Sequence, residues 1–287
     1  MNQNRVIIVG YGPAGVSTSL YTSRAGIETI IVGSNSGALQ KAKEIENYYG
    51  FAEPISGQDL IDKGLAQAKR LGVKIYEQEV VGLDEDDDGF IVKTTVEDFH
   101  AKVVILTTGS SHTKPKWQGV DTFDGMGVSY CAVCDGFFFR GKDVAVAGSG
   151  PYALHEAMSL LPIVGSVSLC TDGAPLTAKF PPEIKILDKP VESLEGDGVL
   201  SAIRFKDGSN LEVSALFVAL GSAGSSELAL TIGADTKNGD ILVDENMRTN
   251  VPGLLAAGDC TGGMKQIAKA VYEGASAGTE AIRILRG

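Results

Sequence analysis

The sequence predicts an α/β fold that combines two nucleotide-binding units of the Rossmann type, the smaller inserted into the larger. A glycine-rich loop, residues 10–15, follows a short β-branched run near the N-terminus. A second glycine loop begins at Gly148, directly after the apolar run 144–147. A third apolar run, 251–259, then completes the first unit. We therefore expect a discontinuous first domain over residues 1–112 and 244–287, and an inserted domain over residues 113–243.

The first unit opens with Val6-Ile7-Ile8-Val9, a β-branched run typical of a buried parallel strand. Gly10-Tyr11-Gly12-Pro13-Ala14-Gly15 follows, then a predicted helix over 16–24 and a strand over 28–32. This is a β-α-β unit with GxGxxG at its turn. The glycines let the backbone approach a pyrophosphate, and the helix N-terminus supplies free N–H groups and a positive dipole end.

The remaining elements follow from hydrophobic periodicity. Apolar residues at helical spacing predict an amphipathic helix over 59–71. The acidic run 84–89 is expected as a solvated hairpin tip, since it lacks the spacing of a calcium loop. Residues 110–117 are expected to link the two units. The other predicted strands lie over 74–76, 90–95, 103–106, 166–170, 203–205, 211–213 and 216–220, with helices over 151–161 and 265–286.

Composition excludes several classes of function. The chain has 287 residues and a net charge of −11, which disfavours binding to nucleic acid or to an anionic membrane surface. No apolar run approaches the roughly 20 residues needed to span a bilayer. Residues 5–9 enter a strand without a signal-peptide pattern, and the chain has four cysteines, so we expect a cytoplasmic protein.

Cys131-Ala132-Val133-Cys134 lies just before the second glycine loop. In a reducing compartment a CxxC pair is either catalytic or half of a zinc site. Zinc would need two further ligands, but Cys170 and Cys260 are single and distant and the histidines are scattered. We expect no metal, and we expect Cys170 and Cys260 to be buried apolar residues.

The segment from Gly127 to Phe138, continuing through 140–146, closely resembles the active-site segment of the low-molecular-weight thioredoxin reductases. Three other segments resemble flavin motifs of that family: residues 44–51, Thr108-Gly109, and residues 256–259 with Gln266-Ile267. They occur in the family's order, from about residue 5 to the end of the chain. A departure is Ser36-Gly37-Ala38-Leu39, where the family usually has Gly-Gly-Gln-Leu.

The resemblance implies a fold in which an FAD domain carries an inserted, smaller domain of the NAD(P)H-binding type. The glycine turn would hold the FAD pyrophosphate and Asp259 a ribityl or nearby hydroxyl, while Asn47 and the backbone at Gln266 and Ile267 would lie near the flavin ring. The residues implied to bind FAD are Gly10, Gly12, Pro13, Ala14, Gly15, Leu39, Asn47, Thr108, Gly109, Gly258, Asp259, Gln266 and Ile267.

For the dithiol, the resemblance implies that Cys134 faces the flavin and that Cys131 attacks the disulfide of a thioredoxin through a mixed disulfide. Asp135 would act as the acid and base of the exchange; a turn role in Asp-Gly is the competing interpretation. A homodimer and a rotating small domain are also implied.

The sequence departs from the family where the second unit would bind NADPH. The family places a His-Arg-Arg-type cluster after the second strand of that unit, but residues 171–178 contain no Arg, Lys or His, and Asp172 would repel a phosphate. Tyr152 places a ring where a small residue normally lets the pyrophosphate approach. NADPH is therefore not expected.

Two interpretations remain open for the electron donor. In the first, Asp172 selects NADH by a hydrogen bond to the ribose of the nucleotide. In the second, the second unit binds no nucleotide and reduced ferredoxin supplies electrons to FAD, as in the flavin-only branch of the family that the sequence resembles. We favour ferredoxin over both NADH and a residual use of NADPH, and we favour an enzyme over a flavin-binding protein without turnover. Lys114 with Lys116, or Arg140 with Lys142, are candidate docking cations for the acidic ferredoxin.

Overall fold

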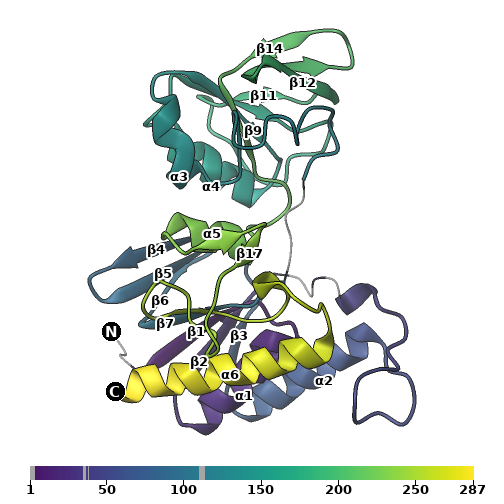
Figure 1. The fold of residues 1–287 in the computed structure, drawn as a ribbon, viewed down its shortest axis with the longest axis vertical. Coiled ribbons are helices and arrows are strands. Elements are labelled where there is room, and N and C mark those ends of the chain that lie inside the picture. Colours follow the sequence, from purple (N-terminus) through teal and green to yellow (C-terminus); the bar gives the residue numbers. More distant parts are fainter. Residues whose placement is uncertain (1–3, 35–36, 38, 110–113) are drawn as a thin grey trace. The chain divides into compact units, whose positions relative to one another are not determined.

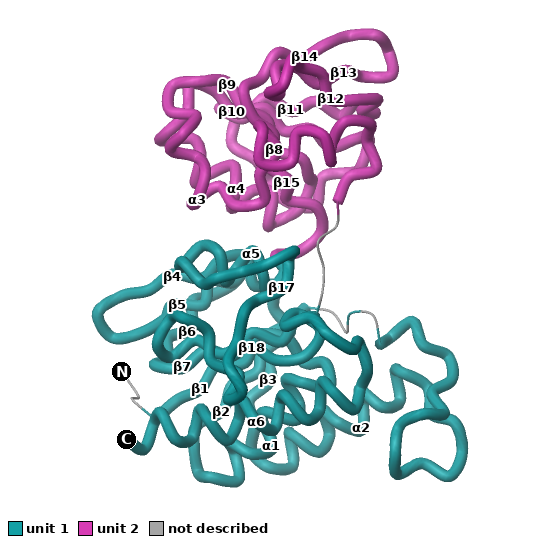
Figure 2. Tube along the Cα trace, in the orientation of Figure 1, with its two compact units in different colours: residues 1–112, 224–287 teal, residues 113–223 magenta. Residues whose placement is uncertain are grey.

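The computed structural model describes residues 4–34, 37, 39–109 and 114–287. Its chain divides into two compact units, residues 1–112 with 224–287, and residues 113–223 (Figure 2). The expected boundary at 243/244 differs from this division. The segment after residue 223 belongs to unit 1, because its helix contacts a strand of that unit: Thr231 Oγ1 donates to Leu83 O at 3.0 Å.

Unit 1 is built on a parallel sheet in the order β18-β7-β1-β2-β3. Val6 of β1 pairs with Thr29 of β2 on one side and with Val103 of β7 on the other. The strands are β1 (Arg5–Val9), β2 (Glu28–Val32), β3 (Lys74–Tyr76), β7 (Val103–Leu106) and β18 (Leu254–Ala256). The β-branched residues of β1, β2 and β7 are buried, as expected for parallel strands covered on both faces, whereas Ile75 of the edge strand β3 is partly buried.

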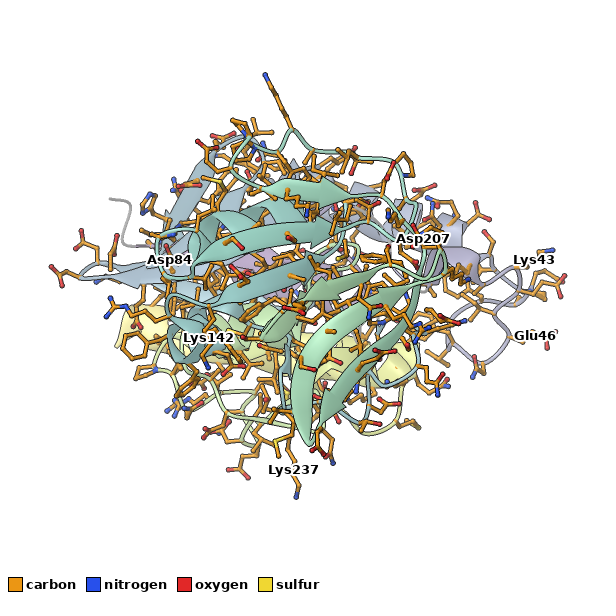
Figure 3. All side chains as sticks on the ribbon, turned by 90° about the horizontal axis from the view of Figure 1, so that it is seen from above. Lys43, Glu46, Asp84, Lys142, Asp207 and Lys237 are labelled. Atoms are coloured by element: carbon orange, nitrogen blue, oxygen red, sulfur yellow. A yellow bond between two sulfur atoms is a disulfide. The ribbon has the colours of Figure 1, made fainter. Side chains whose placement is uncertain are left out.

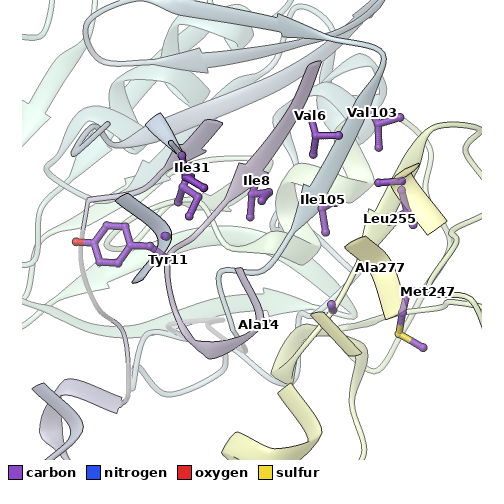
Figure 4. Packing of buried hydrophobic residues seen from close by; sticks show 14 of the residues in the cluster. Val6, Ile8, Tyr11, Ala14, Ile31, Val103, Ile105, Met247, Leu255 and Ala277 are labelled. Carbon is purple, nitrogen blue, oxygen red and sulfur yellow. The ribbon is translucent and has the colours of Figure 1, made fainter. Parts of the chain in front are cut away.

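Two long helices, α1 (Pro13–Arg24) and α6 (Ile267–Arg286), pack against each other beside this sheet (Figure 1). A side chain at Gly274 would clash with Ala14 O, so the glycine permits the close crossing of the helices. The core between helices and sheet is made of Val6, Ile8, Ile31, Val103, Ile105, Leu255 and Ala277, with Tyr11, Ala14 and Met247 at its edges (Figure 4).

Helix α2 (Gly57–Arg70), also in unit 1, begins two residues before the expected start. Ser56 is its N-cap, and its Oγ accepts a hydrogen bond from Asp59 N at 3.1 Å. The other elements of unit 1 are η1 (Leu39–Lys41), β4 (Val80–Asp86), β5 (Gly89–Thr94), β6 (Asp98–Ala101), α5 (Ser225–Thr231), β16 (Thr236–Lys237), β17 (Asp240–Ile241) and η3 (Asp259–Thr261). The acidic run forms the tip of the β4–β5 hairpin, with Asp86 opposite Gly89, as predicted.

Unit 2 repeats the β-α-β pattern in a parallel sheet of order β11-β10-β9-β15-β8, with an antiparallel sheet, β12-β13-β14, beside it in the chain. Its elements are β8 (Val128–Ser129), α3 (Ala132–Asp135), η2 (Gly136–Phe139), β9 (Asp143–Ala147), α4 (Pro151–Leu160), β10 (Ser166–Cys170), β11 (Lys185–Leu187), β12 (Val191–Asp197), β13 (Val199–Phe205), β14 (Asn210–Glu212) and β15 (Ala215–Val218). The redox segment connects β8 to β9, so both cysteines lie in this unit.

Charged side chains of both signs, among them Lys43, Glu46, Asp84 and Lys142, project from the surface (Figure 3). In the part of the chain that the structure describes, no helix has the length and apolar character needed to cross a bilayer.

Candidate functional site

The first glycine loop joins β1 to α1 in unit 1. Gly10 has a positive φ of 104°, and a Cβ there would lie 2.7 Å from Thr107 O. A Cβ at Gly15 would clash with Gly10 O, because the first turn of the helix packs directly on the loop. Around Gly12, by contrast, a Cβ would meet nothing within 4 Å. The loop is therefore closed against the protein at Gly10 and Gly15 and open at Gly12.

This geometry fits a pyrophosphate. Gly12 is the N-cap of α1 and Pro13 occupies its first turn, so no side chain of the described residues caps this helix N-terminus. Free N–H groups at the start of a helix bind phosphate oxygens.

The C-terminal motif lies beside that loop. The Cβ of Ala14 is 3.0 Å from the position that a Cβ at Gly258 would take, so the two segments lie against each other. Gly258 has a φ of 91° and donates its N–H to Glu273 Oε2 at 2.8 Å. Lys269 Nζ donates to Gly258 O at 2.8 Å and forms an ion pair with Glu273 at 3.0 Å. This pair holds the turn that presents Asp259.

Sequence reasoning missed Lys269 and Glu273, because their partners lie 11 and 15 residues away across a turn. Their spacing of four residues at the start of a predicted helix was the available signal.

The other implied flavin-binding residues gather on unit 1 as well. Asn47 Nδ2 donates to Gln266 Oε1 at 3.0 Å, which joins positions 219 residues apart. Thr108 N donates a hydrogen bond to the Oγ of Ser225, the first residue of α5, at 3.0 Å. Gly109 has a φ of 82°, Leu39 lies in η1 with its side chain against the core of unit 1, and Ile267 is the first residue of α6. In the segment 36–39, where the sequence differs from the family's Gly-Gly-Gln-Leu, Ser36 and Ala38 lie outside the described residues.

The two cysteines of the CxxC motif are joined by a disulfide, with their Cα atoms 5.3 Å apart. They differ in accessibility. Cys131 is 4 % exposed, whereas Cys134 is exposed. Cys131 is the N-cap of α3, and its sulfur accepts a hydrogen bond from Cys134 N at 3.1 Å.

The oxidised pair exposes Cys134 alone, so the role implied for Cys131, attack on the partner disulfide, requires this sulfur to become accessible and stays a prediction. A nucleophile arriving from outside meets Cys134 Sγ first, and breaking the S–S bond there releases Cys131 as the thiolate. The N–H of Cys134 stabilises that thiolate, because hydrogen bonds to the charged form favour it.

Polar groups surround the buried cysteine. Ser129 Oγ donates to Asp135 Oδ2 at 2.7 Å and accepts from Cys131 N at 3.1 Å. Glu156, on α4 and 3 % exposed, accepts from Ala132 N at 2.8 Å. Sequence reasoning found Asp135 and missed Ser129 and Glu156. Glu156 could be placed only by the packing of α3 on α4.

The second glycine loop, between β9 and α4, is covered by a later segment of the chain. Thr177 N donates to Ser149 O at 2.9 Å, and a Cβ at Gly150 would lie 3.1 Å from Thr177 Oγ1. Gly150 therefore faces Thr177, unlike the open Gly12 of the first loop. Tyr152, whose ring the sequence places where a pyrophosphate would approach, is buried, with 4 % of its surface exposed.

Both carboxylate oxygens of Asp172, the candidate ribose ligand, accept hydrogen bonds from residues of unit 2. Its Oδ1 accepts from Val191 N at 2.6 Å and its Oδ2 accepts from Trp117 Nε1 at 3.0 Å. It has a positive φ of 54°, a conformation that Asp tolerates better than most residues. These contacts make it a turn residue that connects β10, β12 and the segment around Trp117.

Cys170 and Cys260 are free and buried. Burial raises the pKa of each thiol to about 12, with Asp172 adding to the effect at Cys170. Thiols with such pKa values are inert near neutral pH. Among the described residues, no group of three or more His, Cys, Asp or Glu could hold a metal ion.

Residues 4–274 match the model of the family described as pyridine nucleotide-disulphide oxidoreductase. The chain is 34 % identical to the thioredoxin reductase of Listeria innocua over 294 residues, covering 96 % of this chain and 92 % of that protein. The chain belongs to the thioredoxin reductases of this family.

Two solved thioredoxin reductase structures are also similar. The atypical thioredoxin reductase TRi of Desulfovibrio vulgaris Hildenborough matches with a TM-score of 0.92 and 41 % identity, covering 99 % of this chain and 98 % of that one. A ferredoxin-flavin thioredoxin reductase of Clostridium acetobutylicum matches with a TM-score of 0.72 and 32 % identity, covering 98 % of both chains. The likeness of the thioredoxin reductases confirms the predicted family and the predicted Rossmann-like α/β fold.

Proposed function

We propose that this protein is an FAD-dependent reductase that reduces thioredoxin through the Cys131–Cys134 pair and receives its electrons from reduced ferredoxin. Two features of unit 2 support ferredoxin as the donor: both carboxylate oxygens of Asp172 already accept hydrogen bonds, and residues 171–178 contain no cation. The Cys131–Cys134 pair supports disulfide reduction as the reaction.

The dithiol reaction needs a nucleophilic sulfur and a disulfide partner. The reduced pair gives two electrons to the partner disulfide, whose two sulfurs each take up a proton, and the Cys131–Cys134 disulfide re-forms. The hydrogen bond from Cys134 N stabilises Cys131 as the attacking thiolate. A binding protein without turnover would not need a thiolate-stabilising contact within the CxxC pair.

The surface beside the pair suits a protein substrate. Val133, Phe137 and Phe138 are 53 %, 65 % and 72 % exposed, and they flank Cys134 in the chain. Large exposed apolar side chains around a reactive group favour docking of a protein rather than a small thiol. Thioredoxin is the substrate named for the relatives, and we propose it here.

FAD would bind in unit 1, on the open Gly12 side of the first loop, with Asp259 and the start of α6 holding its other parts. When bound, FAD can accept single electrons and deliver a pair to a disulfide. These residues of the chain would hold the cofactor, and Lys269 and Glu273 fix the turn that carries Asp259.

The second unit is poorly suited to NADPH. Residues 171–178 offer no cation for a 2′-phosphate. Charge-assisted hydrogen bonds contribute about 1.5–3 kcal/mol each, so losing two weakens binding about a hundredfold to more than ten-thousandfold. Asp172 does not compensate by selecting NADH, since its two carboxylate oxygens already accept from Val191 and Trp117.

Ferredoxin is proposed as donor because it delivers single electrons, which FAD can accumulate. The name of the relative from Clostridium acetobutylicum includes ferredoxin and flavin, which supports the proposal, while other relatives are named simply as thioredoxin reductases. Of the candidate docking cations, Lys114 is paired with Asp124 at 2.8 Å, a contact that raises its pKa. Arg140 and Lys142 lie within 6 Å of the rings of Phe137 and Phe139. The homodimer and the cytoplasmic location stay predictions.

The proposal is tested by reducing thioredoxin anaerobically with three donors in parallel: reduced ferredoxin, NADPH and NADH. We expect thioredoxin thiols to appear only with ferredoxin. Cys131→Ser should abolish the transfer while the protein stays yellow. Full activity of Cys131→Ser would refute the dithiol mechanism, and rapid turnover with a nicotinamide would refute the donor.

A further inference from the structure

The hydroxyl of Ser129 links the backbone of Cys131 to the carboxylate of Asp135. Ser129 is the last residue of β8 and is 6 % exposed, and it pairs with Phe217 of β15. Its Oγ accepts from Cys131 N at 3.1 Å and donates to Asp135 Oδ2 at 2.7 Å. The strand pairing fixes the serine, and the serine in turn fixes the carboxylate relative to the redox pair.

We propose that Ser129 is a positioning residue that holds Asp135 in place to exchange protons with the Cys131–Cys134 pair. The inference rests on the proposed disulfide-reductase function and extends it to a residue that does not itself touch the substrate. The neighbouring carboxylate, Glu156, is less suited to the task, because it is 3 % exposed and already accepts from Ala132 N.

A serine suits this position because it can serve both protonation states of Asp135. Its single hydroxyl hydrogen has two acceptors within reach, Asp135 Oδ2 at 2.7 Å and Cys131 O at 3.4 Å. When Asp135 is ionised, the hydrogen points to Oδ2. When Asp135 is protonated, its O–H can donate to Ser129 Oγ while the serine hydrogen turns to Cys131 O. Only a hydroxyl rotation separates the two states.

The proton balance of the exchange uses both states. The Cys131 thiolate attacks a sulfur of the partner disulfide, the partner S–S bond breaks, and the departing sulfur takes the proton of Asp135. The Cys134 thiol then gives its proton to the Asp135 carboxylate, and its sulfur attacks Cys131 to close the enzyme disulfide. The second partner sulfur leaves and takes that proton. Two thiols are formed, and Asp135 ends ionised and bonded to Ser129.

The test exploits the leaving group. A departing alkyl thiolate is basic and gains from a proton donor, whereas the thiolate released from an aromatic disulfide such as DTNB leaves unaided. The enzyme is reduced with dithiothreitol, freed of it, and mixed in a single turnover with bis(2-hydroxyethyl) disulfide or with DTNB. Neither ferredoxin nor thioredoxin is needed, so failure of this inference is distinct from failure of the proposed function.

We expect Ser129→Ala to slow the reaction with the alkyl disulfide about tenfold, less than the roughly 10²-fold or more for loss of a general acid, because Asp135 itself remains. The DTNB reaction should stay within about twofold. Ser129→Thr keeps the hydroxyl and should restore the rate. In the Asp135→Asn background, Ser129→Ala should have no further effect, because interacting residues are not additive.

Equal slowing with both disulfides, or the same Ser129→Ala effect with and without Asp135, would show a structural role only and overturn the inference. An unchanged rate with the alkyl disulfide would overturn it as well. Thermal unfolding and flavin absorbance of each variant check that the fold is intact. If the alanine variant is unstable, the rates of Ser129→Thr with the two disulfides are compared with those of the unaltered protein instead.

Discussion

Trp117 donates its indole N–H to Asp172 Oδ2 at 3.0 Å, and the other oxygen of the same carboxylate accepts from Val191 N. The residue that could have selected an NADH ribose instead connects three segments of unit 2. Asp172→Ala should therefore lower the free energy of unfolding by about 1–3 kcal/mol, since each hydrogen bond contributes about 1 kcal/mol. Thermal or urea unfolding measures the loss.

Trp117→Phe is the matched control, since it removes one of the two bonds and should cause a smaller loss of stability. Neither variant should change the response of the flavin to NADH. If Asp172→Ala left stability unchanged and weakened a measurable affinity for NADH, Asp172 would be a nucleotide ligand.

The two glycines of the first loop should respond differently to alanine. A Cβ at Gly15 would clash with Gly10 O, so Gly15→Ala should fold poorly and yield little soluble protein. A Cβ at Gly12 meets nothing within 4 Å and its φ of −68° suits alanine, so Gly12→Ala should fold normally. Its methyl group would stand on the open side of the loop, and we expect FAD affinity to fall at least tenfold.

FAD content after purification and fluorescence titration of the apoprotein measure this difference. If Gly12→Ala retained FAD with unchanged affinity, the pyrophosphate would not lie on the open side of the loop.

Glu156 anchors the redox helix α3 to α4 through Ala132 N. Glu156→Ala would leave a buried N–H without its acceptor, which costs about 1–3 kcal/mol. Glu156→Gln keeps an acceptor at the same place and should lose less. Glu183→Ala, at an exposed carboxylate of the same unit, is the control and should be neutral. Calorimetric unfolding checks the order; a neutral Glu156→Ala would contradict the anchoring role.

Cys170 and Cys260 should take no part in the redox cycle, because burial raises the pKa of each thiol to about 12. Below this pKa the thiol form dominates, so neither should react quickly with DTNB near neutral pH. In the folded protein, the oxidised enzyme should show no reactive thiol, and mild reduction should expose those of Cys131 and Cys134 alone. Denaturation should release the other two. Rapid labelling of Cys260 in the folded protein would contradict the prediction.

The sequence was most informative where one local rule decides the structure. The β-branched runs predicted β1, β2 and β7, and the CxxC motif predicted the disulfide pair. The features that depend on contacts between distant parts of the chain could not be predicted. The assignment of α5 to unit 1 depends on contacts with β4, and the occupation of Asp172 depends on a tryptophan 55 residues away. The hydrogen bonds of Ser129 and Glu156 to the redox segment could not be predicted, because they depend on how α3 packs beside β8 and α4.

Electrons should reach the flavin without a hydride donor and leave through sulfur. Anaerobic titration of the oxidised, FAD-loaded protein with reduced ferredoxin, NADPH and NADH in separate cells, followed by the flavin absorbance, checks this expectation. We predict bleaching within seconds by ferredoxin and none by either nicotinamide. Prompt bleaching by NADPH or NADH, or a flavin that ferredoxin leaves oxidised, would contradict the account.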